Sequence, residues 1–102
     1  MQVNWKDKTY DVAFGRFKTG NSVALILKRG HEDERPSVNI PDMLDDDELA
    51  IKNYSELSGI LDALFEAKVI EHPHRFITNE AVDFPIVRLT EEALDLLADA
   101  EY

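Results

Sequence analysis

The sequence lacks cysteine, is poor in glycine and proline, and contains no long apolar segment. Its 102 residues include four Gly, four Pro and no Cys, which excludes disulfides, a thiol nucleophile and thiolate metal sites. The longest uninterrupted apolar run covers residues 23–27, whereas a membrane-spanning helix needs about twenty apolar residues. The first residues contain no apolar segment typical of a secretory signal. We therefore expect a cytoplasmic protein.

Catalytic motifs are absent as well. The chain contains no G-x-S-x-G motif, and Ser55 and Ser58 fall where a helix is expected to begin. A chain of this length also leaves little room for a deep, enclosed active site. We therefore predict that the protein is not an enzyme, has no catalytic residues and uses no cofactor.

Two clusters contain residue types that bind metals. Five acidic side chains fall within residues 42–48, and carboxylate oxygens suit calcium, but the run lacks the glycine and the closing glutamate of a calcium loop. His72 and His74 flank a proline beside Glu71, a set that zinc could accept together with water. A solvated loop and surface histidines explain these clusters more simply, so we predict no metal site.

Negative charge is the strongest feature of the composition. The chain has 21 acidic and 11 basic side chains and a formal net charge of −10. Residues 1–35 carry seven basic and five acidic groups, whereas residues 36–102 carry four basic and sixteen acidic groups. Direct binding to nucleic acid or to anionic lipid is disfavoured, because both require a positive surface. An acidic surface suits a basic protein partner instead, although acidic charge also serves solubility alone.

The acidic residues that could face such a partner fall in two segments. One is the run within residues 42–48, and the other is the expected C-terminal helix, where acidic residues recur at i, i+4 and i+8 and share one face. Like charges at this spacing slightly destabilise a helix, a cost that either solubility or partner binding explains. The predicted partner-binding residues are Asp42, Asp45, Asp46, Asp47, Glu48, Glu91, Glu92, Asp95 and Asp99.

The strand pattern predicts an α+β fold in a single domain, residues 1–102. Residues 9–17 alternate between apolar and polar side chains, residues 22–28 are apolar on both faces, and the turn between them favours an antiparallel hairpin. Further short extended segments are expected near Val3 and Trp5 and in residues 37–40, 48–52, 75–78 and 84–89. We predict one antiparallel sheet of four to six short strands.

Two helices are expected to complete the fold. Residues 55–67 place apolar side chains at i, i+3, i+4, i+7 and i+8, which predicts a main helix that packs one apolar stripe on the sheet. Gly59 lies inside this segment, and close packing against the sheet would explain it. Thr90 is expected to cap a short C-terminal helix.

Two other functions remain open from the residues alone. Asn53, Tyr54 and Glu56, at the start of the main helix, could hydrogen-bond a small ligand such as a nucleotide or metabolite, with Lys52 and Arg75 as cations. Capping and loop closure explain the same polar residues. Exposed sheet edges could instead pair in an accessory protein that self-associates.

Part of the chain resembles a known family. Residues 38–42, 45–56 and 59–64 are similar to a small, uncharacterised bacterial domain family found in phages, conjugative elements and their hosts, and the resemblance extends over residues 9–89. Its most specific part is IKNYSE, residues 51–56. The chain departs from the family pattern at Leu57, where a polar residue is expected, and at Lys68, where glycine is expected.

The resemblance implies a biological context but supplies no catalytic residues, because the family has no assigned activity. Small acidic proteins of mobile elements are often accessory factors that block a host protein, commonly by occupying its nucleic-acid-binding surface. We therefore predict a non-catalytic, acidic binding protein or inhibitor that acts as a nucleic-acid mimic. Its expected partner is a basic, nucleic-acid-binding host protein, such as a CRISPR effector or another defence nuclease.

Overall fold

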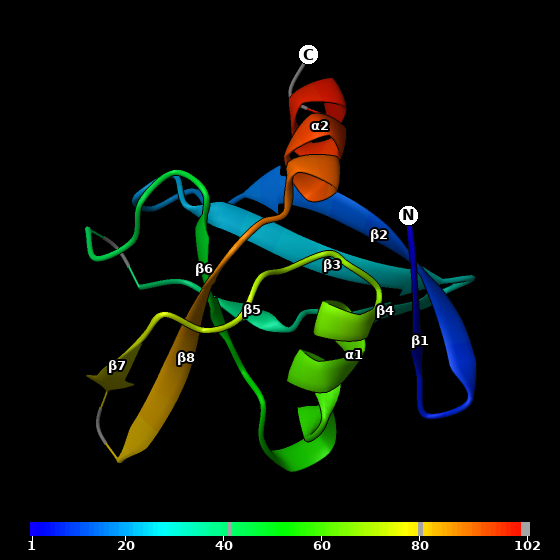
Figure 1. Cartoon of the computed structure of the whole chain (residues 1–102), viewed down its shortest axis with the longest axis horizontal. Coiled ribbons are helices and arrows are strands. Elements are labelled where there is room, and N and C mark those ends of the chain that lie inside the picture. The colour runs from blue at the N-terminus through cyan, green and yellow to red at the C-terminus, as the bar shows by residue number, and fades with distance from the viewer. Residues whose placement is uncertain (41, 80, 101–102) are drawn as a thin grey trace.

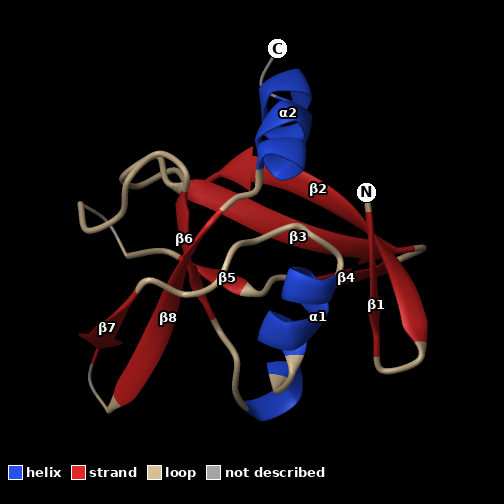
Figure 2. Cartoon of the chain, in the orientation of Figure 1, coloured by secondary structure: helices blue, strands red, loops and turns tan. Residues whose placement is uncertain are grey.

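The computed structural model of the chain describes residues 1–40, 42–79 and 81–100 (Figure 1). Within these residues it contains eight strands and two α-helices (Figure 2). The strands form two antiparallel sheets of four strands each. The predicted α+β class is therefore confirmed, but the prediction of one sheet with four to six strands is wrong. None of the described helices is long and apolar enough to cross a membrane.

The first sheet is built around the predicted N-terminal hairpin. Its strands in spatial order are β1 (Gln2–Trp5), β2 (Lys8–Arg16), β3 (Val23–Arg29) and β4 (Glu32–Glu34). The register places Val12 opposite Leu27 and Phe14 opposite Leu25, so the predicted hairpin is confirmed. β4 lies in a segment so rich in charge that its pattern suggests a loop. It pairs with β3 through the backbone while its side chains remain exposed or half-buried.

The second sheet contains the segments that follow. Its strands in spatial order are β5 (Ser37–Val38), β6 (Glu48–Ile51), β8 (Val82–Arg88) and β7 (Arg75–Asn79). Pairing between β6 and β8 ends at Ala50 and Ile86. The next residue of β8 is Pro85, which has no N–H group to donate to a neighbouring strand. β7 and β8 therefore continue past β6 as a two-stranded ribbon, which extends away from the other elements in Figure 1.

Both sheets contribute to one main apolar core, together with the two helices α1 (Ile60–Glu66) and α2 (Glu91–Ala100). Because side chains alternate along a strand, β6 directs Leu49 and Ile51 into this core and Ala50 to the opposite face. That opposite face carries a second, smaller apolar cluster. Its buried members are Ile40, Ala50, Ile77, Phe84 and Ile86.

The helix predicted over residues 55–67 is interrupted at Gly59. A 3₁₀ turn, η1 (Ser55–Leu57), precedes the break and α1 follows it. Gly59 has φ 89°, and a Cβ added there would meet only Trp5 Nε1, at 3.9 Å. The left-handed backbone therefore explains this glycine, and the prediction of close packing is wrong. The expected lengths are also reversed, since α1 has seven residues and α2 has ten.

The end of α1 and the start of α2 are joined by hydrogen bonds. Lys68 takes φ 62°, and α1 closes with bonds from Lys68 N–H to Phe65 O and from Val69 N–H to Leu64 O, both 3.0 Å, the Schellman pattern. Thr90 Oγ1 accepts from Ala93 N–H at 3.2 Å, so the predicted cap is confirmed, and it also donates to Lys68 O at 2.6 Å.

Replacing Gly59 with alanine should lower the free energy of unfolding by about 1 kcal/mol, because a residue with a Cβ is strained in the left-handed region. Gly15→Ala is the matched control, since an added Cβ there meets nothing within 4 Å and Gly15 has no positive φ. The control should leave stability nearly unchanged or raise it slightly. Urea unfolding followed by circular dichroism measures both. Equal stability of the two variants would contradict this account of the break.

Candidate functional site

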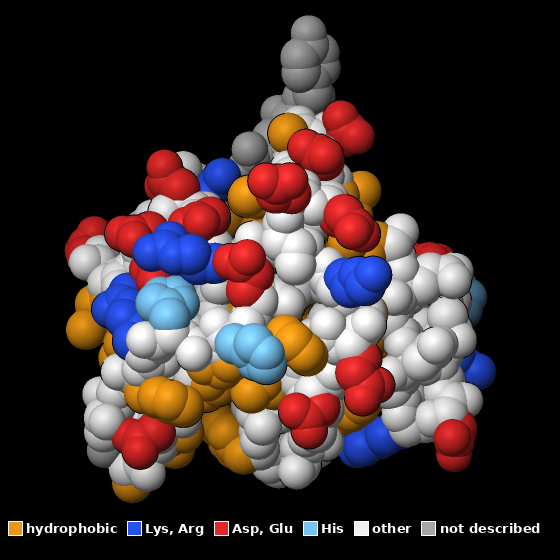
Figure 3. Space-filling view, in the orientation of Figure 1, with side chains coloured by type: hydrophobic (Ala, Val, Ile, Leu, Met, Phe, Trp, Pro, Cys, Tyr) orange, Lys and Arg blue, Asp and Glu red, His pale blue; other side chains and the backbone are white. Residues whose placement is uncertain are grey.

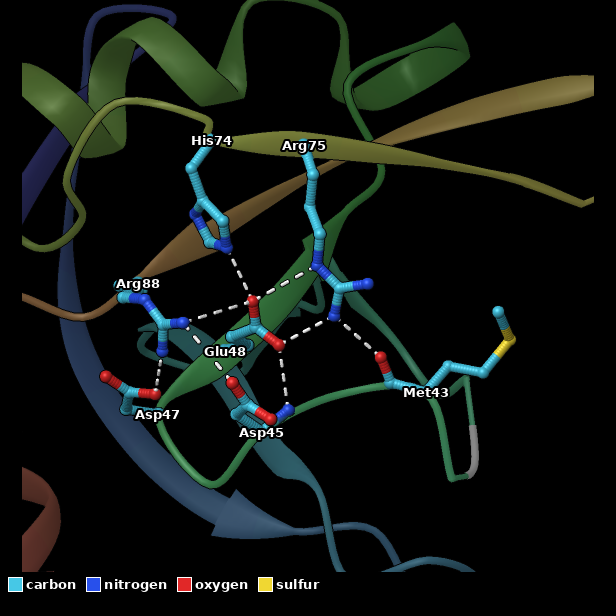
Figure 4. A network of polar contacts seen from close by, with 7 residues as sticks. All are labelled: Met43, Asp45, Asp47, Glu48, His74, Arg75 and Arg88. Atoms are coloured by element: carbon cyan, nitrogen blue, oxygen red, sulfur yellow. Dashed lines mark hydrogen bonds and ion pairs between the residues drawn. The ribbon is translucent and has the colours of Figure 1, made fainter.

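The acidic run within residues 42–48 is divided between the surface and the interior. Glu48 begins β6, and its side chain is only 1% exposed. Strand alternation turns Glu48 to the same face as Ala50, and Arg88 lies directly opposite it on β8. Arg75 reaches the same carboxylate from β7 (Figure 4). A charged group in the interior requires such partners, because an unpaired buried charge is costly.

The Glu48 carboxylate is fully engaged by hydrogen bonds. Oε1 accepts from Arg75 Nη2 at 2.7 Å and from the backbone N–H of Asp45 at 2.8 Å. Oε2 lies 2.5 Å from His74 Nε2 and accepts from Arg75 Nε at 3.3 Å, with Arg88 Nη2 at 3.8 Å. We use the name Glu48 network for Glu48, the residues that contact its carboxylate, and Asp47, which pairs with Arg88. Its members are Asp45, Asp47, Glu48, His74, Arg75 and Arg88.

The Glu48 network also fixes the loop that precedes β6. Arg88 pairs with Asp47 at 2.6 Å and with Asp45 at 3.2 Å, and Arg75 donates to the backbone carbonyl of Met43 at 2.7 Å. Residues 43–47 are thereby held against β7 and β8, although the two arginines are 27 or more residues away along the chain.

The partners of Glu48 keep its carboxylate ionised. Burial alone would raise the pKa of Glu48, but hydrogen bonds from Arg75, the Asp45 backbone and His74 outweigh it and lower the pKa from 4.5 to about 2. The same contact raises the pKa of Arg75. At neutral pH, the network therefore holds a permanent negative charge inside the second sheet.

These contacts change the expected role of three predicted partner-binding residues. Glu48 is buried, so the prediction that it contacts a partner directly is wrong. Asp45 and Asp47 are accessible but already paired with Arg88. Asp42 and Asp46 are exposed, and neither forms an ion pair with another residue that the structure describes.

The other four predicted residues lie on α2 and are exposed. The helix buries Ala93 and Leu97, which leaves its acidic side chains on the outer face. None of them forms an ion pair with a described residue. They are Glu91, Glu92, Asp95 and Asp99.

The two acidic segments adjoin each other in space. Leu89, two residues before α2, donates its N–H to the carbonyl of Asp47 at 3.1 Å. Figure 3 shows acidic side chains over α2 and, beside it, a mixed group of acidic, basic and histidine side chains. We use the name acidic surface for the exposed carboxylates of these two segments that form no ion pair with a described residue. They are Asp42, Asp46, Glu91, Glu92, Asp95 and Asp99.

The polar junction before α1 is occupied with structural contacts. Asn53 Oδ1 accepts from Leu61 N–H at 3.0 Å, which caps the first turn of α1. Lys52 Nζ pairs with Glu56 at 2.6 Å, holds the pKa of that carboxyl well below its usual range, and lies 5.4 Å from the centre of the Tyr54 ring. A shallow groove of about 490 Å³ lies beside this junction, lined mainly by apolar side chains that include Phe76.

The histidines of the possible zinc site have different partners. The His72 ring stacks on Phe65 with 4.0 Å between ring centres, whereas His74 contacts Glu48. Across the described part of the chain, no group of three or more His, Asp or Glu side chains is arranged to hold a metal ion.

From the sequence, Arg75 is a candidate cation for a small ligand and His74 a candidate zinc ligand, but nothing places either of them, or Arg88, beside Glu48. One sequence feature indicates that Glu48 is buried and paired, because Glu48 begins a segment whose next three residues are Leu49, Ala50 and Ile51. An acidic residue in such a strand needs an internal partner. The identity of that partner depends on the register between β6 and β8, which the sequence does not reveal.

Comparison with protein-family models, with curated proteins and with solved structures found no match to this chain. The resemblance to a domain family of mobile elements therefore stays a prediction from the sequence.

Replacing Glu48 with glutamine should lower the free energy of unfolding by about 2 kcal/mol at pH 7. Breaking a fully buried ion pair costs about 3–5 kcal/mol, but Arg75 and Arg88 are 41% and 38% exposed, so water can solvate the released cations. Asp46→Asn is the control, because Asp46 is exposed, and it should change stability by less than about 0.5 kcal/mol. Urea unfolding compares the two. Equal effects would show that the network contributes nothing to stability.

The free energy of unfolding should depend on pH in the way expected for a carboxyl whose pKa is lowered in the folded state. Its folded pKa of about 2 lies below the ordinary 4.5, so its contribution is complete above pH 4.5 and disappears as the pH falls towards 2. Urea unfolding between pH 6 and pH 2.5 should show that the stability difference between the native chain and Glu48→Gln narrows on acidification. A constant difference would contradict the assignment.

Proposed function

We propose that this chain is a non-catalytic binding protein whose acidic surface docks on a basic surface of another protein. One observation supports this proposal best: all four carboxylates of α2 are exposed and unpaired with described residues. Repulsion between carboxylates one turn apart destabilises the helix slightly. A cationic partner would relieve that repulsion on binding.

The Glu48 network supports the proposal by fixing the rest of the surface. Because Arg75 and Arg88 hold residues 43–47 in one arrangement, Asp46 is presented beside α2 on an ordered loop. A preorganised surface loses less conformational entropy on binding than a mobile one. Arg88 also pairs with Asp45 and Asp47, which moves the centre of the proposed surface from the loop to α2.

The partner class follows from charge. An anionic surface attracts proteins that carry exposed Lys and Arg, and long-range attraction speeds their encounter at low salt. Such surfaces are typical of nucleic-acid-binding proteins. With the predicted origin in a mobile element, the sharpest form of the proposal is a cytoplasmic inhibitor of a host-defence nuclease, such as a CRISPR effector, which would compete with nucleic acid.

A small-ligand function is the second candidate, because the groove beside Tyr54 has room for a ligand. The polar groups that would hold one are already engaged: Asn53 caps α1 and Lys52 pairs with Glu56. The carboxylates of the acidic surface, in contrast, form no ion pair with any residue that the structure describes. This difference makes the protein-binding function the better supported one.

Removing the charge of α2 should weaken partner binding at least tenfold. The test variant replaces Glu91 and Glu92 with Gln and Asp95 and Asp99 with Asn. A bacterial protein captured by the native chain at 50 mM salt should be released at 500 mM. The captured protein should bind the variant at least tenfold more weakly than the native chain. The native chain should also displace this protein from DNA.

The matched control removes the same number of charges from the first sheet and its β1–β2 turn, by replacing Asp7, Asp11, Glu32 and Asp33 with their amides. This control should retain binding, because these residues lie outside the acidic surface. Equal loss of binding in both variants would mean that only net charge matters. Undiminished binding of the α2 variant would overturn the proposal.

A further inference from the structure

A groove at one end of the acidic surface has a composition that differs from the rest of it. It lies between the C-terminal end of α1 and the first turn of α2 and has a volume of about 440 Å³. Its lining residues are Phe65, Glu66, Lys68, Thr90, Glu91 and Glu92. The groove therefore combines an aromatic ring with carboxylates on an otherwise polar surface.

The aromatic ring is exposed but held in place. Phe65 is 40% exposed. Its ring stacks on His72, with ring centres 4.0 Å apart and planes inclined by 33°. The segment that carries His72 is anchored on both sides, because Glu71 N–H donates to Arg88 O at 2.9 Å and His74 N–H donates to Ile86 O at 3.1 Å.

The two walls of the groove are also fixed to each other. The Thr90 hydroxyl donates to the carbonyl of Lys68 at 2.6 Å, so the first turn of α2 is tied to the end of α1. Three carboxylates line the groove against one ammonium group, and none of the four forms an ion pair with a described residue. The groove is therefore both preformed and negatively charged.

We propose that this groove receives an arginine side chain of the basic partner. A guanidinium group is planar, stacks on aromatic rings and pairs with carboxylates through two parallel hydrogen bonds. Phe65 supplies the ring, and Glu91 and Glu92 supply the carboxylates. A lysine ammonium, which is compact and strongly hydrated, would gain less from the ring. The inference rests on the proposed function and adds a chemical preference to it.

The test uses the full chain and two fluorescent peptides of equal charge, hexa-arginine and hexa-lysine. Fluorescence anisotropy at 50 mM salt should show that hexa-arginine binds about fivefold more tightly, the size expected for a cation–aromatic contact near the surface. Phe65→Leu should reduce this preference to less than twofold and leave hexa-lysine binding unchanged. Phe76→Leu is the matched control, since Phe76 is 64% exposed and outside the groove, and it should keep the preference.

Backbone amide spectra recorded during the titration give a second measurement. Hexa-arginine should shift the amides of Lys68, Glu91 and Glu92 more than that of Phe76. Equal affinity for the two peptides, or a preference that survives Phe65→Leu, would overturn the arginine site. In that case, weaker binding of both peptides to the four-residue α2 variant would still support the acidic surface. If neither peptide binds the native chain, both proposals fail.

Discussion

The arrangement of the second sheet depends on one buried carboxylate. Glu48 stands at the start of a strand with no exposed side chain, and a charge in that position is stable only if cations and donors surround it. Meeting this requirement brings together Arg75, Arg88 and His74, which come from separate positions on β7, β8 and the segment before them. The same arginines then determine where the preceding loop lies.

This requirement also explains why an acidic run does not become a uniformly acidic surface. Glu48, Asp45 and Asp47 are paired with arginines of the second sheet, whereas Asp42 and Asp46 form no ion pair with a described residue. On α2, the buried face is made by Ala93 and Leu97, and the acidic side chains form no ion pair with a residue that the structure describes. The proposed function and the proposed arginine site therefore centre on the helix.

Local patterns predicted most of the elements, because they depend on neighbouring residues. Alternation identified β2, the apolar run identified β3, and Thr90 identified the cap of α2. The number of sheets was missed because it depends on which strands pair. β4 was missed because its charged side chains give no apolar pattern, although its backbone pairs with β3. The break at Gly59 was missed because an apolar stripe continues across it. In the site, exposure of the α2 acids followed from spacing, whereas the burial of Glu48 depends on a register formed by distant residues.

The loss of a backbone donor at Pro85 divides the second sheet into two mechanically different parts. After Pro85, Ile86 pairs with both β6 and β7, and Val87 and Arg88 pair with β6, whereas the residues of β8 before Pro85 pair with β7 alone. A ribbon supported on one edge opens at a lower free-energy cost than a strand in the middle of a sheet. Beyond Pro85, the β7–β8 ribbon therefore relies on the burial of Ile77 and Phe84 in the smaller apolar cluster, and not on backbone pairing with β6, to stay against the rest of the sheet.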